Sequence, residues 1–159
     1  MSVTAWRIAV EAPQYAADDM SGTGARISGG RWNSCGVPMV YASSNIALAA
    51  LETLTGKQAA ALPYNRYLIQ LEIPEHIWER RQTLSPCPGG WDALPCGVSS
   101  KRVGDGWVKA GQSALMIVPS VIIPDENNVL INPAHPDAAA IASSTLKRFA
   151  CDPRFFSSV

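Results

Sequence analysis

The stretch SGTGARISGGRWNSCGVPMVYASSNIALAALETL, Ser21–Leu54, contains glycines, an arginine, a tyrosine and a lone glutamate at short intervals. Its first part, Ser21–Gly24, has the composition of a loop, and residues 26–33 add two more glycines. Residues 39–41, Met-Val-Tyr, predict a short strand. The stretch therefore predicts a glycine-rich loop that leads into a strand and then into a helix.

The helix is predicted directly after that strand, over residues 45–54. Ser44 is a suitable N-cap and Gly56 is a suitable stop. Six consecutive apolar residues, 46–51, cover nearly the whole circumference and predict a helix that is buried on most sides. At about 100° per residue, Glu52 points away from the expected core face. That face consists of Ala47, Ala50, Leu51 and Leu54.

Short strands and helices are predicted on both sides of this stretch. The expected strands are residues 3–9, 66–73, 114–118, 120–123, 129–131 and 145–149. The expected helical segments are residues 16–20, 99–110 and 136–142, and residues 83–98 predict a long loop around Trp91. The absence of a regular β-α-β alternation favours an α+β fold with a largely antiparallel sheet. We expect one domain over residues 1–159.

The composition is typical of a globular protein: 47% of the 159 residues are hydrophobic and 16% are charged. Thirteen basic and 13 acidic residues give a net charge of zero, which argues against direct binding of nucleic acid. We see neither a signal peptide nor an apolar run of membrane-spanning length, so we expect a cytoplasmic protein with no membrane partner. The four cysteines form no C-x-x-C pair, and we expect no metal site.

Gly29-Gly30-Arg31 is a candidate anion site. Glycines let a ligand approach the backbone and aim N–H groups at an anion, and an arginine can hold a phosphate through two hydrogen bonds. The pattern suits a pyrophosphate, although it is neither G-x-G-x-x-G nor a P-loop. The alternative is a glycine turn whose arginine forms a structural salt bridge.

Three further residues are candidates, and each has a structural alternative. Tyr41 can stack on a flat heterocycle, or it can pack in the core. Glu52 is the one acid in an apolar helical segment; it can stabilise a developing cation, or it can be a solvated carboxylate. Ser120 is a weak signal alone. A Ser-His-Asp hydrolase has little support because the chain has no G-x-S-x-G motif.

Taken in order, these residues resemble the RES-domain family, which is named for its arginine, glutamate and serine. The matching segments extend over nearly the whole chain, and their order and spacing are specific. They are Trp6-Arg7, Gly30–Asn33, Tyr41 with the following helix to Glu52, Val118–Ser120 and Leu130–Pro136.

The resemblance implies the toxin of a bacterial type II toxin–antitoxin module, with a fold similar to ADP-ribosyltransferases. The implied partner is an Xre-type helix-turn-helix antitoxin, and a homo-oligomer within the complex stays open. The resemblance also implies that NAD is consumed as a substrate, without a further cofactor. The implied active-site residues are Arg31, Tyr41, Glu52 and Ser120. The implied NAD-binding residues are Gly29, Gly30, Arg31 and Tyr41.

These residue types suit cleavage of the nicotinamide–ribose bond. Nicotinamide leaves as a neutral base, so no general acid is required, while the ribose gains oxocarbenium-like charge. Glu52 would stabilise that charge, Arg31 would hold the pyrophosphate and Tyr41 would stack on nicotinamide. Ser120 would either orient Glu52 or bind the phosphate side.

The acceptor of the ADP-ribosyl group stays open. Water would make the protein a glycohydrolase, phosphate would make it a phosphorylase, and a side chain of a host protein would make it a transferase. Two other classes compete: a nucleotide-binding module without turnover and a toxin that degrades RNA. Zero net charge argues against the RNA-degrading toxin.

Overall fold

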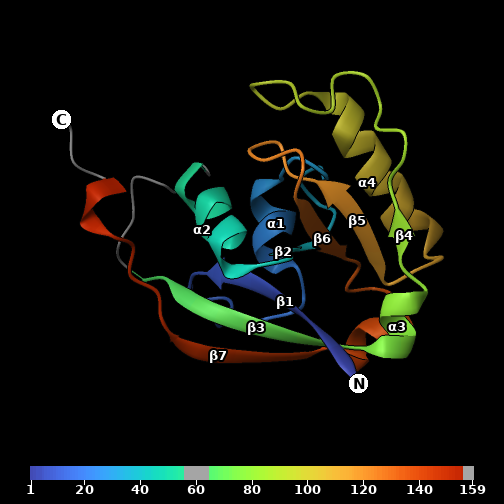
Figure 1. Cartoon of the computed structure of the whole chain (residues 1–159). Coiled ribbons are helices and arrows are strands. Elements are labelled where there is room, and N and C mark those ends of the chain that lie inside the picture. Colours follow the sequence, from blue (N-terminus) through green and yellow to red (C-terminus); the bar gives the residue numbers. More distant parts are fainter. Residues whose placement is uncertain (56–64, 156–159) are drawn as a thin grey trace.

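A seven-stranded sheet forms the centre of the computed structural model, which describes residues 1–55 and 65–155 (Figure 1). The strand order is β4-β5-β6-β2-β1-β3-β7, and the neighbouring strands are antiparallel except for β4 and β5. This confirms the predicted α+β class with a mostly antiparallel sheet. The strands are β1 (Ser2–Ala9), β2 (Val40–Ser43), β3 (Tyr67–Pro74), β4 (Gln82–Thr83), β5 (Leu115–Pro119), β6 (Asn127–Ile131) and β7 (Ala142–Arg148).

Short helices connect these strands. Helix α2 contacts β1 and β2, whereas α4 lies at the β4–β5 end of the sheet (Figure 1). The two helices therefore lie over different parts of the sheet. The α-helices are α1 (Thr23–Ser28), α2 (Ile46–Thr55), α3 (Glu75–Glu79) and α4 (Val98–Ala110), and the 3-10 helices are η2 (Pro136–Ala140) and η3 (Pro153–Phe155).

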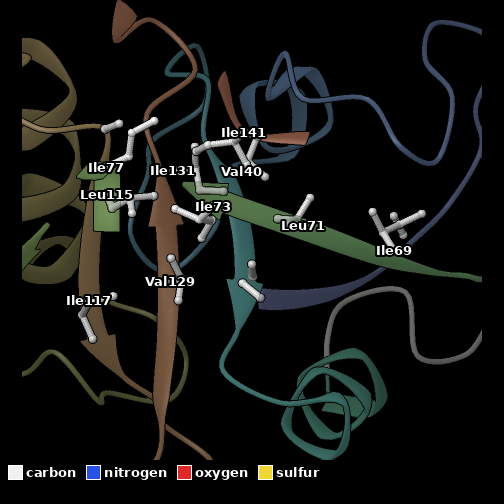
Figure 2. Close-up of a cluster of buried hydrophobic side chains, with 14 of the residues drawn as sticks. Val40, Ile69, Leu71, Ile73, Ile77, Leu115, Ile117, Val129, Ile131 and Ile141 are labelled. Carbon is white, nitrogen blue, oxygen red and sulfur yellow. The ribbon is translucent and has the colours of Figure 1, made fainter. Parts of the chain in front are cut away.

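One side of the sheet carries the larger hydrophobic core. Leu115 and Ile117 of β5 and Val129 and Ile131 of β6 point into it at every second position (Figure 2). The strand predicted over residues 66–73 is confirmed as β3, and its side chains on that side also belong to this core. They are Ile69, Leu71 and Ile73, with Tyr67 packed against them.

On the opposite side of the sheet, β2 carries Tyr41 and Ser43. Tyr41 pairs with Leu130, and Ser43 pairs with Asn128. Because successive side chains alternate between the two sides, Tyr41 and Ser43 share one side, with Cα atoms about 7 Å apart. A second cluster packs on this side against Tyr41. Its buried members are Trp32, Met39, Trp107, Met116, Val118 and Leu130.

Helix α2 begins one residue later than predicted. Asn45 caps it in place of Ser44, because Asn45 Oδ1 accepts a hydrogen bond from the Leu48 N–H at 2.8 Å. Both residue types favour this position, so propensity alone does not separate them. The predicted stop, Gly56, lies outside the described residues.

The buried face of α2 also differs from the prediction. Leu48 and Ala49 are buried, whereas Ala47 is exposed and Leu51 is half-buried. The apolar run extends around the whole helix, so its periodicity does not single out the face that meets the sheet. Glu52 lies one turn after Leu48 and shares its side of the helix.

Three local predictions in the first half of the chain and around Ser120 are wrong. Residues 16–20 form turns in place of a helix, and α1 begins at Thr23, inside the predicted loop Ser21–Gly24. Residues 120–123 bend in place of forming a strand. The Ser120 hydroxyl accepts hydrogen bonds from two backbone N–H groups of this segment, and this local bonding competes with strand pairing.

The last predicted elements are displaced, and two short elements were not predicted. Strand β7 covers residues 142–148 in place of 145–149, and the helix before it is a 3-10 helix that ends at Ala140. Strand β7 is an exposed edge strand with several serine and threonine residues, so it has no hydrophobic alternation to mark it. Helix α3 and the two-residue strand β4 carry no distinct sequence signal.

Candidate active site

The loop after α1 closes into a tight turn at residues 30–33. The Gly30 N–H donates to the Asn33 carbonyl oxygen at 3.0 Å. The Tyr41 hydroxyl reaches this turn from β2, where it donates to Asn33 Oδ1 at 2.6 Å and accepts from the Trp32 N–H at 3.0 Å. Burial raises the pKa of Tyr41 above its ordinary value of 10.0, so the hydroxyl keeps the proton that it donates. Tyr41 therefore joins β2 to the turn.

The shape of this turn requires Gly29 and Gly30. Gly29 has a φ of +68°, and a Cβ atom on Gly30 would lie 2.7 Å from the Tyr41 hydroxyl oxygen. The two glycine N–H groups donate to the carbonyl oxygens of Ala25 and Asn33 at 2.7 and 3.0 Å. The expectation that they point at an anion is therefore not supported. Approach of NAD to the backbone of Gly29 and Gly30 stays a prediction.

Arg31 holds the loop between β4 and α4. Its Nη1 donates to the carbonyl oxygens of Trp91 at 2.8 Å and Ala93 at 3.0 Å. The Trp91 ring stacks on Trp32 with ring centroids 6.2 Å apart and planes inclined by 24°. Among the described residues, no carboxylate lies within salt-bridge distance of Arg31. The structural salt bridge is thus not formed there, and the predicted long loop is fixed to the candidate arginine.

Helix α4 supports residues 31–34. A Cβ atom on Gly104 would lie 1.6 Å from the Trp32 carbonyl oxygen, so only glycine permits this contact. The Asp105 carboxylate accepts hydrogen bonds from the Ser34 N–H at 2.9 Å and from the Ser34 hydroxyl at 2.6 Å. Gly104 lowers the helix propensity of α4, but it lets the helix approach the turn.

Glu52 extends from α2 toward the ends of β5 and β6. Its Oε1 accepts hydrogen bonds from the Ser120 hydroxyl at 2.7 Å and from Asn128 Nδ2 at 2.6 Å. Ser120 is fully buried at the end of β5. Of the two roles left open for Ser120, this geometry supports the orientation of Glu52.

Asn128 and Ser43 belong to this arrangement, and the sequence reasoning missed both. The Ser43 hydroxyl donates to Asn128 Oδ1 at 2.8 Å across the β2–β6 pair. Asn128 lies just outside the strand predicted over residues 129–131, whereas β6 begins at Asn127. Ser43 had a usable signal, because it lies two positions after Tyr41 and so shares its side of β2.

The structure thus arranges the four predicted active-site residues in two groups on one side of the sheet. The Arg31 group contains Arg31, Tyr41 and the 30–33 turn. The Glu52 group contains Glu52, Ser120, Asn128 and Ser43. Strand β2 connects the groups, because it carries Tyr41 in the first and Ser43 in the second. A ligand that lies across Tyr41 and Ser43 of β2 would have the Arg31 guanidinium at one end and the Glu52 carboxylate at the other.

Three negative findings concern residues 1–55 and 65–155. No group of three or more histidine, cysteine, aspartate or glutamate side chains is arranged to bind a metal ion. In the same part of the chain, no helix is both long and apolar enough to cross a bilayer. The four cysteines are not joined in disulfides.

The fold and this set of residues define an α+β protein with an arginine, a tyrosine, a glutamate and a serine on one side of a sheet. Comparison with known families matches residues 4–152 to the RES domain. The chain therefore belongs to the RES-domain family, which confirms the family indicated by its motifs.

Similar proteins include two named toxins and a chain of a toxin–antitoxin complex. The chain is 47% identical over 156 residues to the "Prs ADP-ribosylating toxin" of Sphingobium sp. (strain YBL2), covering 97% of each protein. It is 35% identical over 144 residues to "Toxin Res" of Yersinia enterocolitica, covering 89% of this chain and 93% of that protein. The M. tuberculosis MbcT–MbcA toxin–antitoxin complex contains a chain of the same fold, with a TM-score of 0.65 and 18% identity. That match covers 93% of this chain and 86% of the other.

Proposed function

We propose that this protein is the toxin of a toxin–antitoxin pair and that it consumes NAD by breaking the nicotinamide–ribose bond. The observation that carries the proposal is the pairing of Glu52 with Ser120, at 2.7 Å, on the same side of the sheet as Arg31 and Tyr41. The toxin names of its relatives, at 47% and 35% identity, support the same class.

In the proposed reaction, the bond between ribose C1′ and the nicotinamide nitrogen breaks and its electron pair leaves with nicotinamide. The positive charge of the nicotinamide ring is thereby neutralised, and positive charge develops on the ribose. Glu52 stabilises that charge and binds a ribose hydroxyl. Arg31 binds the pyrophosphate through the donors that remain beside Nη1, and the Tyr41 ring lies against nicotinamide. An acceptor then forms a bond to C1′ and releases a proton.

The acceptor divides the proposal into three reactions. Transfer to a side chain of another protein has specific support, because a relative at 47% identity is named an ADP-ribosylating toxin. Water and phosphate are the other acceptors, and they would give ADP-ribose and ADP-ribose with a phosphate on the same C1′ atom. Mass spectrometry of the products of NAD, with and without phosphate and cell extract, separates the three.

The test of bond cleavage uses purified protein and NAD. Release of free nicotinamide is expected from the wild-type protein, whereas Glu52→Ala should release none above background. Equal release by the two proteins would contradict the proposed role of Glu52. Degradation of RNA with NAD left intact would favour an RNA-degrading toxin, and NAD binding without turnover would favour a binding module.

The proposed partner is an Xre-type antitoxin that covers the site, because a free NAD-consuming enzyme would harm its own cell. Relatives named "Toxin Res" and the fold of the MbcT–MbcA complex support a partner of the antitoxin class. If a helix-turn-helix protein is encoded beside this gene, its co-expression is expected to prevent NAD loss. Unchanged NAD loss in the presence of the bound partner would contradict this role.

A further inference from the structure

The two oxygen atoms of the Glu52 carboxylate have different surroundings. Oε1 accepts hydrogen bonds from Ser120 Oγ at 2.7 Å and Asn128 Nδ2 at 2.6 Å. Within the described part of the chain, no hydrogen bond to Oε2 is formed. Oε1 is therefore occupied by the protein, and Oε2 is the oxygen that is left for a ligand.

The direction of the hydrogen bond from Ser120 is fixed by its other partners. A serine hydroxyl has one proton to donate and two lone pairs that accept. The N–H groups of Ile122 and Ile123 donate to Ser120 Oγ at 3.1 and 3.2 Å, so both lone pairs are used. The single hydroxyl proton is then available only for Glu52, and Ser120 is a donor with a fixed direction.

The direction of the hydrogen bond from Asn128 is fixed in a similar way. The opposite amide orientation would place Oδ1 against Glu52 Oε1 at 2.6 Å, and two acceptor oxygens repel each other at that distance. In the observed orientation, Oδ1 accepts the Ser43 hydroxyl proton at 2.8 Å while Nδ2 donates to Glu52. Ser43 is buried, with 4% of its surface exposed, so water does not readily replace this contact.

We infer that Asn128 is a positioning residue for Glu52 and that Ser43 acts through Asn128. The hydrogen bonds from Ser43 to Asn128 and from Asn128 to Glu52 hold Oε1 in place and direct Oε2 toward the reacting sugar. This inference rests on the proposed function for the identity of the sugar. It does not need Asn128 or Ser43 to touch the substrate.

Loss of this positioning should lower kcat more than it changes KM. The Arg31 group, which holds the pyrophosphate in the proposed function, contains neither Asn128 nor Ser43. Asn128→Ala is therefore expected to lower the kcat for nicotinamide release by about 10- to 100-fold, because small misplacements of catalytic groups have effects of this size. The KM for NAD should change by less than about threefold, as expected when only transition-state contacts are lost.

A double-mutant cycle separates positioning from a general structural role. If Ser43 acts through Asn128, then Ser43→Ala lowers kcat in the wild-type protein and has no further effect in Asn128→Ala. Asn127→Ala is the matched control, because Asn127 is an exposed neighbour whose side chain points to the other side of β6. Its kcat and KM should equal those of the wild type.

The measurements are steady-state nicotinamide release and the melting temperature of each variant. Additive losses from Ser43→Ala and Asn128→Ala, or a wild-type kcat in folded Asn128→Ala, would overturn the inference. If Asn128→Ala does not fold, Ser43→Ala carries the test, because it removes one hydroxyl and still predicts a lower kcat at unchanged KM.

Growth arrest after induction in bacteria distinguishes this inference from the proposed function. If wild-type protein arrests growth in a Glu52-dependent way but releases no nicotinamide, the proposed function is wrong. The positioning role is then tested by the growth of induced cells: Asn128→Ala should relieve the arrest, whereas Asn127→Ala should not. If the wild type releases nicotinamide and Asn128→Ala is fully active and toxic, only the inference fails.

Discussion

Arg31 and Glu52 are held in place by different kinds of contact. The Arg31 side chain donates to main-chain carbonyl oxygens of the loop between β4 and α4, at Trp91 and Ala93. Glu52 accepts from side chains at Ser120 and Asn128. A carbonyl oxygen is present whatever the residue, so the Arg31 group depends on the conformation of the loop. The Glu52 group depends on the identity of its residues, so substitutions should distinguish the two groups.

Glu52→Gln should have the largest effect of the substitutions in the Glu52 group. Glutamine keeps the size of the side chain and an oxygen that can accept from Ser120, but it removes the negative charge. Loss of one group that stabilises charge in a transition state costs about 10²- to 10³-fold in kcat. We expect a loss of this size in nicotinamide release, with a melting temperature close to that of the wild type. A fully active Glu52→Gln would show that the charge is not used.

Arg31→Ala should have the next largest effect, and it should act on a different quantity. It removes the proposed pyrophosphate contact and leaves the carbonyl oxygens of Trp91 and Ala93 without their donor. We expect kcat/KM for NAD to fall by about 10²-fold, mainly through a higher KM. Residues 84–97 should also become more sensitive to limited proteolysis, and this loss of protection should not occur in Glu52→Gln. If the proteolysis of residues 84–97 were the same in Arg31→Ala as in the wild type, the claim that Arg31 holds this loop would be wrong.

The same contrast explains how much of the site the sequence could predict. Arg31, Tyr41, Glu52 and Ser120 were found because each has a distinctive residue type and a place in the order of a known family. Asn128 was missed because it lies at the start of a short strand beside residues typical of a turn. Its importance comes from a register across β2 and β6, and a single sequence does not show which residues of two distant strands are paired.

The fold was predictable where hydrophobic alternation is strong. Strand β3 was found because its apolar residues alternate along the strand and one side meets the core. Helix α2 was found but its buried face was not, because its apolar residues surround the helix. The edge strand β7 was displaced because exposed serine and threonine residues carry no signal of burial.

Ser120→Ala also tests the Glu52 group, and its expected effect on kcat is smaller than that of Glu52→Gln. Alanine removes the donor to Glu52 and also leaves the N–H groups of Ile122 and Ile123 without their acceptor. We expect a loss in kcat of about tenfold, with KM little changed. The free energy of unfolding should fall by about 1–3 kcal/mol because buried polar groups lose partners. Urea unfolding measures the second effect, and a variant as stable as the wild type would contradict these backbone contacts.

Tyr41 provides the smallest test, through the pH dependence of stability. Burial raises the pKa of Tyr41 above its ordinary value of 10.0, so the unfolded chain loses this proton at a lower pH than the folded protein. The stabilisation is therefore fully present below pH 10.0 and is lost as the pH rises above it. The loss should approach about 1.4 kcal/mol per pH unit while the folded protein keeps the proton.

Tyr41→Phe has no hydroxyl to ionise, so it lacks this dependence. The difference in unfolding free energy between the wild type and Tyr41→Phe should therefore shrink between pH 9 and pH 11, about one unit on each side of the ordinary tyrosine pKa. Groups that titrate alike in both proteins cancel in this difference. The difference in unfolding free energy between the wild type and Ser120→Ala should stay constant over the same pH range. Both proteins contain Tyr41, and serine does not titrate in that range. A constant Tyr41→Phe difference would mean that the hydroxyl does not hold the 30–33 turn as a buried donor, and the Arg31 group would then depend on its loop alone.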